Sequence, residues 1–154
     1  MRAHTILAIA LLLASSGCSN QRLPDSTVVV LEQADQFELL ALDPVPTKSD
    51  HAFHGYAVLG AAKISQTDTR RRLISALRQS MRKRDWVVAT CFNPRHGIRA
   101  TRNGKQIDLV ICFECLSFRL YGDREETFLI TNTPKTLFDE VLKNSGVSLV
   151  RPSL

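Results

Sequence analysis

The dipeptide Asn103–Gly104 constrains the fold of this chain more than any other feature. It lies between two stretches that read as β-strands, 97–102 and 105–113. A two-residue type I′ turn favours Asn-Gly because both of its central positions need a positive φ. The sequence therefore predicts an antiparallel hairpin that turns at these two residues.

That turn also fixes the register of the hairpin. It pairs Arg102 with Lys105, and each later pair follows from the first. Arg99 then faces Asp108, which predicts an oppositely charged cross-strand pair. The opposite face of the hairpin receives the apolar pairs Ile98 with Leu109 and Ala100 with Ile107.

Further strands are predicted on both sides of the hairpin. Each is a short apolar or alternating run, often bounded by Gly, Pro, Asn or Asp. Gly60 lies inside one of them and marks a bulge or a close backbone approach. The expected strands cover residues 37–42, 55–64, 86–92, 116–121 and 126–131.

Helices are predicted in three places. Residues 67–84 form the clearest one, with an apolar arc of Leu73, Ile74, Leu77 and Met81. Residues 134–145 form a C-terminal helix ended by Gly146. Residues 25–34 fit a short helix, although the β-branched run 28–30 equally suits a strand. We expect an α+β fold: an antiparallel sheet of about five to seven strands with the long amphipathic helix and the C-terminal helix packed on it.

The N-terminus reads as an export signal. An Arg precedes the ten-residue apolar stretch Thr5–Ala14, which is too short to span a bilayer and leads into the small residues Ser15–Gly17. The sequence ASSGC that ends at Cys18 resembles the lipobox of bacterial lipoproteins, except that Ser15 stands where that family usually has Leu.

This resemblance implies that Cys18 is acylated, becomes the first residue of the mature protein and binds membrane lipid. Ser19 after the cysteine implies sorting to the outer membrane, facing the periplasm, in a host with two membranes. An ordinary cleaved signal peptide and an uncleaved anchor are the alternatives. The expected organisation is a signal peptide at 1–17, a lipidated N-terminus and short tether at 18–24, and one globular domain at 25–154.

The charge balance is mildly basic. The chain has 20 Lys and Arg against 15 Asp and Glu, for a net charge of +5. This excess permits contact with anionic head groups or envelope polymers, and the export signal argues against nucleic acid as a partner.

Four cysteines raise the question of disulfides. Acylation of Cys18 leaves three in the domain, and an exported compartment favours a bridge. The hairpin register, with one bulge residue near Pro94, brings Cys91 next to Cys115. We therefore expect a Cys91–Cys115 disulfide and a free thiol at Cys112.

Other readings of these cysteines stay open. Cys112 and Cys115 form a CxxC motif, but on a continuous strand their Cα atoms would lie about 10 Å apart, too far for a disulfide. Adding Cys91 and His96 gives a Cys3His set that could bind zinc, although its spacing is not that of a standard finger. A catalytic thiol with His96 as base, and simply buried reduced cysteines, are the remaining readings.

Basic and histidine side chains supply the last candidates. Arg71, Arg78 and Arg82 share one side of the 67–84 helix, and together with Arg95 they could bind an anion. A solvated helix face explains the helical row equally well. His51 and His54 flank Phe53 and suit a metal or a substrate, or are surface residues of a loop.

No phosphate-binding glycine loop, serine nucleophile motif or paired-carboxylate motif is visible in the sequence. We expect a non-catalytic binding or structural lipoprotein of the cell envelope, without a cofactor, whose partner is an envelope protein or an anionic polymer. The alternative is a thiol- or zinc-dependent enzyme that uses Cys91, His96, Cys112 and Cys115.

Overall fold

The computed structural model describes residues 21–81 and 91–148. Within these residues it contains one antiparallel six-stranded sheet and three helices, which confirms the predicted α+β class. The elements in chain order are α1 (Asp25–Glu32), β1 (Gln36–Pro46), β2 (Tyr56–Lys63), α2 (Thr67–Gln79), β3 (His96–Arg102), β4 (Lys105–Cys112), β5 (Ser117–Tyr121), β6 (Glu125–Leu129) and α3 (Lys135–Asn144).

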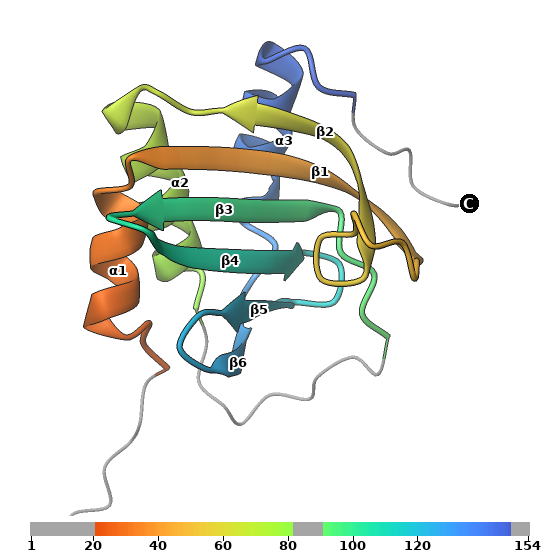
Figure 1. The fold of residues 1–154 in the computed structure, drawn as a ribbon, viewed down its shortest axis with the longest axis horizontal. Coiled ribbons are helices and arrows are strands. Elements are labelled where there is room, and N and C mark those ends of the chain that lie inside the picture. Colours follow the sequence, from red (N-terminus) through yellow and green to blue (C-terminus); the bar gives the residue numbers. More distant parts are fainter. Residues whose placement is uncertain (1–20, 82–90, 149–154) are drawn as a thin grey trace, which may run out of the picture.

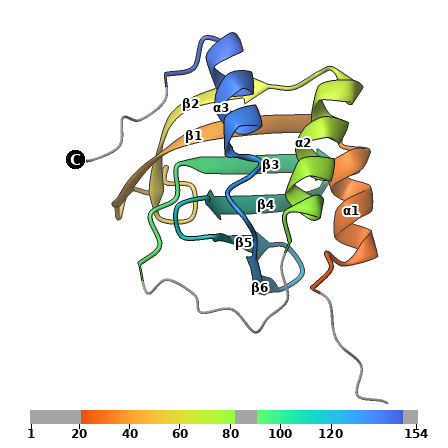
Figure 2. The same ribbon diagram turned by 180° about the vertical axis from the view of Figure 1, so that it is seen from behind.

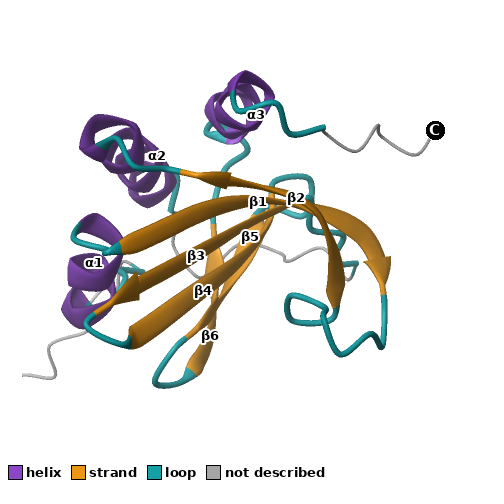
Figure 3. Ribbon diagram, turned by 45° about the horizontal axis from the view of Figure 1, so that its top comes forward, coloured by secondary structure: helices purple, strands orange, loops and turns teal. Residues whose placement is uncertain are grey.

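The sheet has the strand order β2-β1-β3-β4-β5-β6, as Figure 1 shows from top to bottom. The three helices lie on one face of this sheet, which Figure 2 shows from behind. Figure 3 shows the same layering with the top of the molecule tilted toward the viewer. We call the opposite face, which the β1–β2 loop partly covers, the loop face.

The hairpin of β3 and β4 has the predicted register. Arg102 pairs with Lys105, Arg99 with Asp108 and Ile98 with Leu109. Both turn residues have a positive φ, 49° at Asn103 and 77° at Gly104. The Asn-Gly turn therefore sets the centre of the sheet, as the sequence predicts.

The main core lies between the sheet and the helices. The predicted apolar arc of α2 is buried at Leu73, Ile74 and Leu77, and α3 buries Phe138 and Leu142. Alternate residues of β1, β3, β4 and β5 contribute two or more apolar side chains each to the same core, and β6 contributes Phe128. The long helix and the C-terminal helix therefore both pack on the sheet, as predicted.

Gly60 of β2 confirms a close approach. A Cβ atom at this position would lie 2.7 Å from Val147, just after α3. The pairing of β1 with β2 is also irregular next to Gly60, between Ala41 and Leu42 of β1. The lack of a Cβ at Gly60 thus lets Val147, which follows α3, pack closely on the edge of the sheet.

A second, smaller apolar cluster lies on the loop face. It consists of Leu40, Leu42, Phe53, Tyr56 and Val110. Phe53 is 2% exposed and lies over Gly97, where a Cβ atom would come within 2.9 Å of its ring. This contact holds the β1–β2 loop against the sheet.

The largest differences from the prediction concern three elements. Strand β1 extends through Asp43–Pro46, because its last residues still pair with β2 across two irregular positions. Helix α2 ends at Gln79 and not at 84, because Ser80 accepts a hydrogen bond from Thr131 and Met81 forms an isolated bridge with Ile130. The expected strand 86–92 lies mostly outside the described residues, and the described residues 91–95 have no strand structure.

The packed domain begins before Asp25. Leu23 is 6% exposed and belongs to the main core, and the Leu129 amide donates a hydrogen bond of 2.8 Å to Oε1 of Gln21. Residues 21–24 of the expected tether are therefore part of the fold. The expected signal peptide and Cys18 lie outside the described residues.

No helix in the described ranges has the length and apolar character needed to cross a bilayer.

Candidate functional site

The most unusual group on the loop face is the carboxylate of Asp108 in β4. Its side chain is 3% exposed, so it needs partners for both oxygens. Arg99 of β3 donates from Nε to Oδ1 at 3.1 Å and from Nη2 to Oδ2 at 3.0 Å. Gln106 donates to Oδ2 at 3.0 Å, and Nε2 of His54 lies 2.8 Å from the same oxygen.

These contacts keep Asp108 ionised. Burial alone would raise the pKa of its carboxyl group, but the hydrogen bonds from His54 and Arg99 and the charge of Arg99 outweigh burial. The pKa of Asp108 is consequently lower than usual. In return, the hydrogen bond with Asp108 raises the pKa of Arg99.

His54 reaches Asp108 from the β1–β2 loop. It has a φ of 50°, which is uncommon for a residue other than glycine, and Gly55 follows with a φ of 88°. The imidazole stacks on Tyr121 of β5, with ring centroids 3.7 Å apart, and its side chain stays 26% exposed. His54 is thus held in contact with Asp108 and Tyr121 and is not simply a surface residue of the loop.

The paired Arg99 and Asp108 belong to a longer row across the sheet. Neighbouring residues of successive strands pair directly in the order Lys63, Glu38, Arg99, Asp108, Tyr121 and Glu125. We call these six residues the charge ladder. From Lys63 to Asp108 the charges of the ladder alternate in sign, and Tyr121 is its one uncharged member. The charge ladder crosses all six strands on the loop face.

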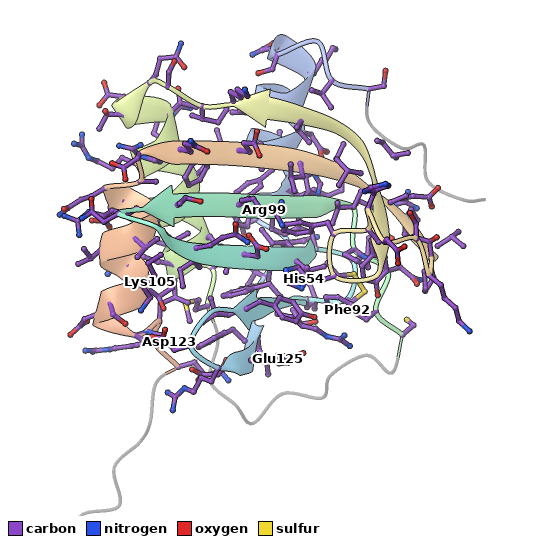
Figure 4. The ribbon with its side chains drawn as sticks, in the orientation of Figure 1. His54, Phe92, Arg99, Lys105, Asp123 and Glu125 are labelled. Carbon is purple, nitrogen blue, oxygen red and sulfur yellow. A yellow bond between two sulfur atoms is a disulfide. The ribbon has the colours of Figure 1, made fainter. Side chains whose placement is uncertain are left out.

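Aromatic rings and arginines accompany the charge ladder. The guanidinium of Arg99 lies 5.0 Å from the ring centroid of Phe53, and that of Arg119 lies 4.3 Å from the ring centroid of Phe92. Figure 4 labels His54, Arg99, Phe92 and Glu125 on this side of the molecule. Burial raises the pKa of Tyr121, so its hydroxyl group stays neutral and can donate a hydrogen bond.

The acidic and imidazole groups of this site are committed to each other. Asp108 is shielded from solvent by the groups that donate to it, and Nε2 of His54 is committed to Asp108. The partners of His54 in the described part of the chain are this carboxylate and aromatic rings. None of those partners is a nucleophile that the imidazole could activate.

The cysteines pair differently from the prediction. Cys112 and Cys115 form a disulfide with their Cα atoms 5.1 Å apart, while Cys91 is exposed and has no disulfide. The predicted Cys91–Cys115 bridge and the predicted free thiol at Cys112 are therefore wrong. Strand β4 ends at Cys112, and the turn of residues 113–116 folds back toward it, so the 10 Å separation of a continuous strand does not apply.

The predicted Cys3His set is not assembled either. His96 is 3% exposed on the helix side of β3, where its Nε2 lies 2.8 Å from Asp139 of α3. Cys112 belongs to the other face and offers no thiolate, because it is oxidised. No group of three or more metal-ligating side chains occurs in residues 21–81 and 91–148.

His96 instead joins α3 to the sheet. Asp139 also accepts a 2.6 Å hydrogen bond from Lys135. Burial would raise the pKa of Asp139, but the hydrogen bonds from His96 and Lys135 lower it below its usual value. A small hollow beside this pair is lined by Arg95, Phe113 and Glu114, among others.

The proposed row of arginines has local acidic partners. Arg71 lies 3.1 Å from Asp68, and Arg78 lies 2.9 Å from Glu32 of α1. Arg82 lies outside the described residues. Arg95 precedes β3 and lies 3.5 Å from Glu114, so it belongs to a different part of the fold from α2.

Comparison with protein-family models, with curated proteins and with solved structures gives no significant match for this chain.

Proposed function

We propose that this protein is a lipid-anchored lipoprotein of the cell envelope and that its loop face binds a partner protein there. The anchor rests on the ASSGC sequence at Cys18. The binding role rests on one observation: the charge ladder and its aromatic neighbours lie on the sheet face that the helices leave uncovered.

The composition of the loop face supports a protein as the partner. Protein interfaces are enriched in Tyr, Phe and Arg, and arginines and aromatic rings make the largest contributions to binding. Phe53, Phe92, Arg99, Arg119 and Tyr121 supply such side chains here. Their ion pairs and stacked rings hold them in place before binding, which lowers the entropic cost of association.

The signs of the charges argue against a uniformly anionic polymer. Glu38 and Glu125 stand in the charge ladder beside the basic residues. A polymer with negative groups at every repeat would meet repulsion at both positions, whereas a folded protein can present complementary charges of both signs.

Photo-cross-linking in the host tests this function. The photoreactive residue p-benzoylphenylalanine is introduced at one of two exposed positions, Lys63 or Thr127. These positions lie at opposite ends of the loop face. The matched control is Arg72→p-benzoylphenylalanine on the exposed side of α2. Irradiation of intact cells should give one discrete protein adduct from the loop-face probes and none from the control.

The same partner should then lose its adduct when Arg99→Glu reverses a charge in the ladder. Adducts from the probe at Arg72 alone, or equal adducts from all three probes, would show that the loop face is not the interface. The envelope anchor is measured separately, by the mass of the mature N-terminal peptide.

A further inference from the structure

The N-terminal residues 21–24 close one edge of the sheet. β6 is an edge strand, and edge strands carry amide groups without a ladder partner. The side chain of Gln21 accepts the hydrogen bond of the Leu129 amide, in the place that a further strand would take. Leu23 enters the main core two residues later, so the chain is fixed on the domain from Gln21 onward.

The distance from this fixed point to the lipid is short. Only Ser19 and Asn20 separate Cys18 from Gln21. Three Cα–Cα steps span at most about 11 Å, even when the chain is fully extended. An acylated Cys18 therefore leaves no room for the domain to move away from the head groups.

We propose that the protein lies with one defined corner against the membrane surface: the N-terminus of α1, the β5–β6 turn and the β6 edge. This orientation rests on the proposed acylation of Cys18. Figure 1 shows the described chain beginning at this corner, next to α1 and β6, while β2 lies at the opposite edge. At about 4.8 Å per strand, the β2 edge stands roughly 24 Å further from the membrane than β6.

The composition of this corner fits contact with hydrated head groups. Lys105 and Asp123 form an ion pair of 2.6 Å, and Arg124 and Glu126 form another. A shallow hollow of about 300 Å³ is lined there by Thr27, Leu120 and Arg124, among others. The charges compensate one another locally, so the short tether and not an affinity for anionic lipid sets the orientation.

The loop face consequently stands upright on the membrane. The charge ladder runs across the strands from β6 to β2, so it extends from the head groups outward. A partner reaches this face from the side, in the plane of the membrane, as a second membrane-attached protein would.

Photo-cross-linking to lipid tests the orientation. The acylated full-length mature protein is reconstituted in phosphatidylcholine vesicles, with Arg124→p-benzoylphenylalanine at the β5–β6 turn. The matched probe is Leu59→p-benzoylphenylalanine on β2, where the native side chain is 48% exposed. We expect lipid adducts at position 124 and about tenfold fewer at position 59.

A linker variant supplies the second measurement. Twelve Gly and Ser residues inserted between Ser19 and Asn20 lengthen the tether from three steps to fifteen. Because effective concentration falls with about the 3/2 power of tether length, the lipid adducts at position 124 should fall about tenfold. Equal adducts at positions 124 and 59, or no loss with the linker, would overturn the orientation.

The failure of the anchor is distinguishable from the failure of the orientation. Mass spectrometry of the N-terminal peptide and flotation with vesicles report acylation alone. An unacylated Cys18 overturns both proposals, whereas an acylated, vesicle-bound protein with equal adducts overturns only the orientation.

Discussion

Asp108 shows how one buried charge can organise a surface. Its carboxylate connects Arg99 on the neighbouring strand with His54 on a loop far away in the sequence. A buried ion pair adds little net stability, since desolvation offsets most of the attraction, but loss of one partner leaves the other uncompensated. Asp108 therefore determines where the β1–β2 loop lies more than how stable the sheet is.

Asp108→Asn should lower the free energy of unfolding by about 2–3 kcal/mol at pH 7, because Arg99 and His54 lose their anionic partner. Urea unfolding followed by circular dichroism measures this loss. The control is Asp123→Asn, in an exposed pair with Lys105, which should cost less than about 1 kcal/mol. Equal losses in the two variants would contradict a special role for Asp108.

The same carboxylate predicts a pH dependence. The pKa of Asp108 is lower in the folded protein than in the unfolded chain, where it is about 3.9. Its ionisation therefore stabilises the fold fully above the unfolded pKa, and this contribution disappears as the pH falls through the lower folded pKa. The stability difference between wild type and Asp108→Asn should shrink between about pH 5 and pH 2. A constant difference over that range, measured by urea unfolding, would show that Asp108 is not stabilised as an anion.

Gly97→Ala tests the seat of the β1–β2 loop. The added Cβ would meet the Phe53 ring at 2.9 Å, and overpacking of this kind costs about 1–3 kcal/mol. Thermal unfolding should show the loss, and the double variant Gly97→Ala with Phe53→Leu should recover part of it. A double variant that is simply the sum of the two single losses would mean that the two residues do not interact.

At the level of elements, the sheet centre was predictable and the β4–β5 turn was not. Asn103–Gly104 fixed the register because its backbone requirement is local and specific. The turn at residues 113–116 contains Leu116 with a φ of 54°, a conformation for which leucine gives no sequence indication. Treating Cys112 and Cys115 as residues three apart on a strand hid the short distance between them.

The cysteine pairing gives a direct prediction for this element. Mature native protein treated with iodoacetamide should gain one carbamidomethyl group, on the exposed Cys91, and two more after reduction and unfolding. Intact-mass measurement counts them. Modification of Cys112 or Cys115 before reduction would show that the bridge is not formed in the native protein.

Replacing Cys112→Ser and Cys115→Ser together should cost roughly 2 kcal/mol, because so short a loop restricts the unfolded chain only modestly. Cys91→Ser is the matched control and should leave the midpoint of urea unfolding unchanged. A larger loss of stability from Cys91→Ser than from the double replacement would contradict the prediction and would mean that the Cys91 side chain contacts residues outside the described ranges.

Contacts between distant segments limited the prediction of the site. Arg99 and Asp108 were paired correctly because both lie in one hairpin. His54 was named only as one of two loop histidines, since nothing local in the sequence shows that the loop folds back onto β4. The helix face of α2 followed from its period, whereas its end at Gln79 depends on Ser80 and Thr131, which meet only in the folded chain.

At the scale of the whole molecule, the anchor and the domain make one prediction together. Cys18→Ser should abolish the proposed acylation and move the protein from the membrane fraction to the soluble fraction, because the proposed anchor supplies the membrane affinity. Cell fractionation and the N-terminal mass measure both effects. Since the described contacts of the domain start at Gln21, its thermal unfolding should stay unchanged. A membrane-bound Cys18→Ser protein would require another attachment.

The strand order has a consequence for how the chain reaches its final form. β1 pairs with β3, so residues such as Gln36 and Thr101 must meet across the whole of β2 and α2. Folding slows as contacts join segments that are more distant in the chain. The sheet cannot close until its central hairpin has been synthesised, and β2 gains its cover from Val147 only when the C-terminal helix arrives. Slow closure of this kind would suit the proposed export, because the precursor would still be unfolded when it is threaded through an export channel and would form the proposed membrane-facing corner only afterwards.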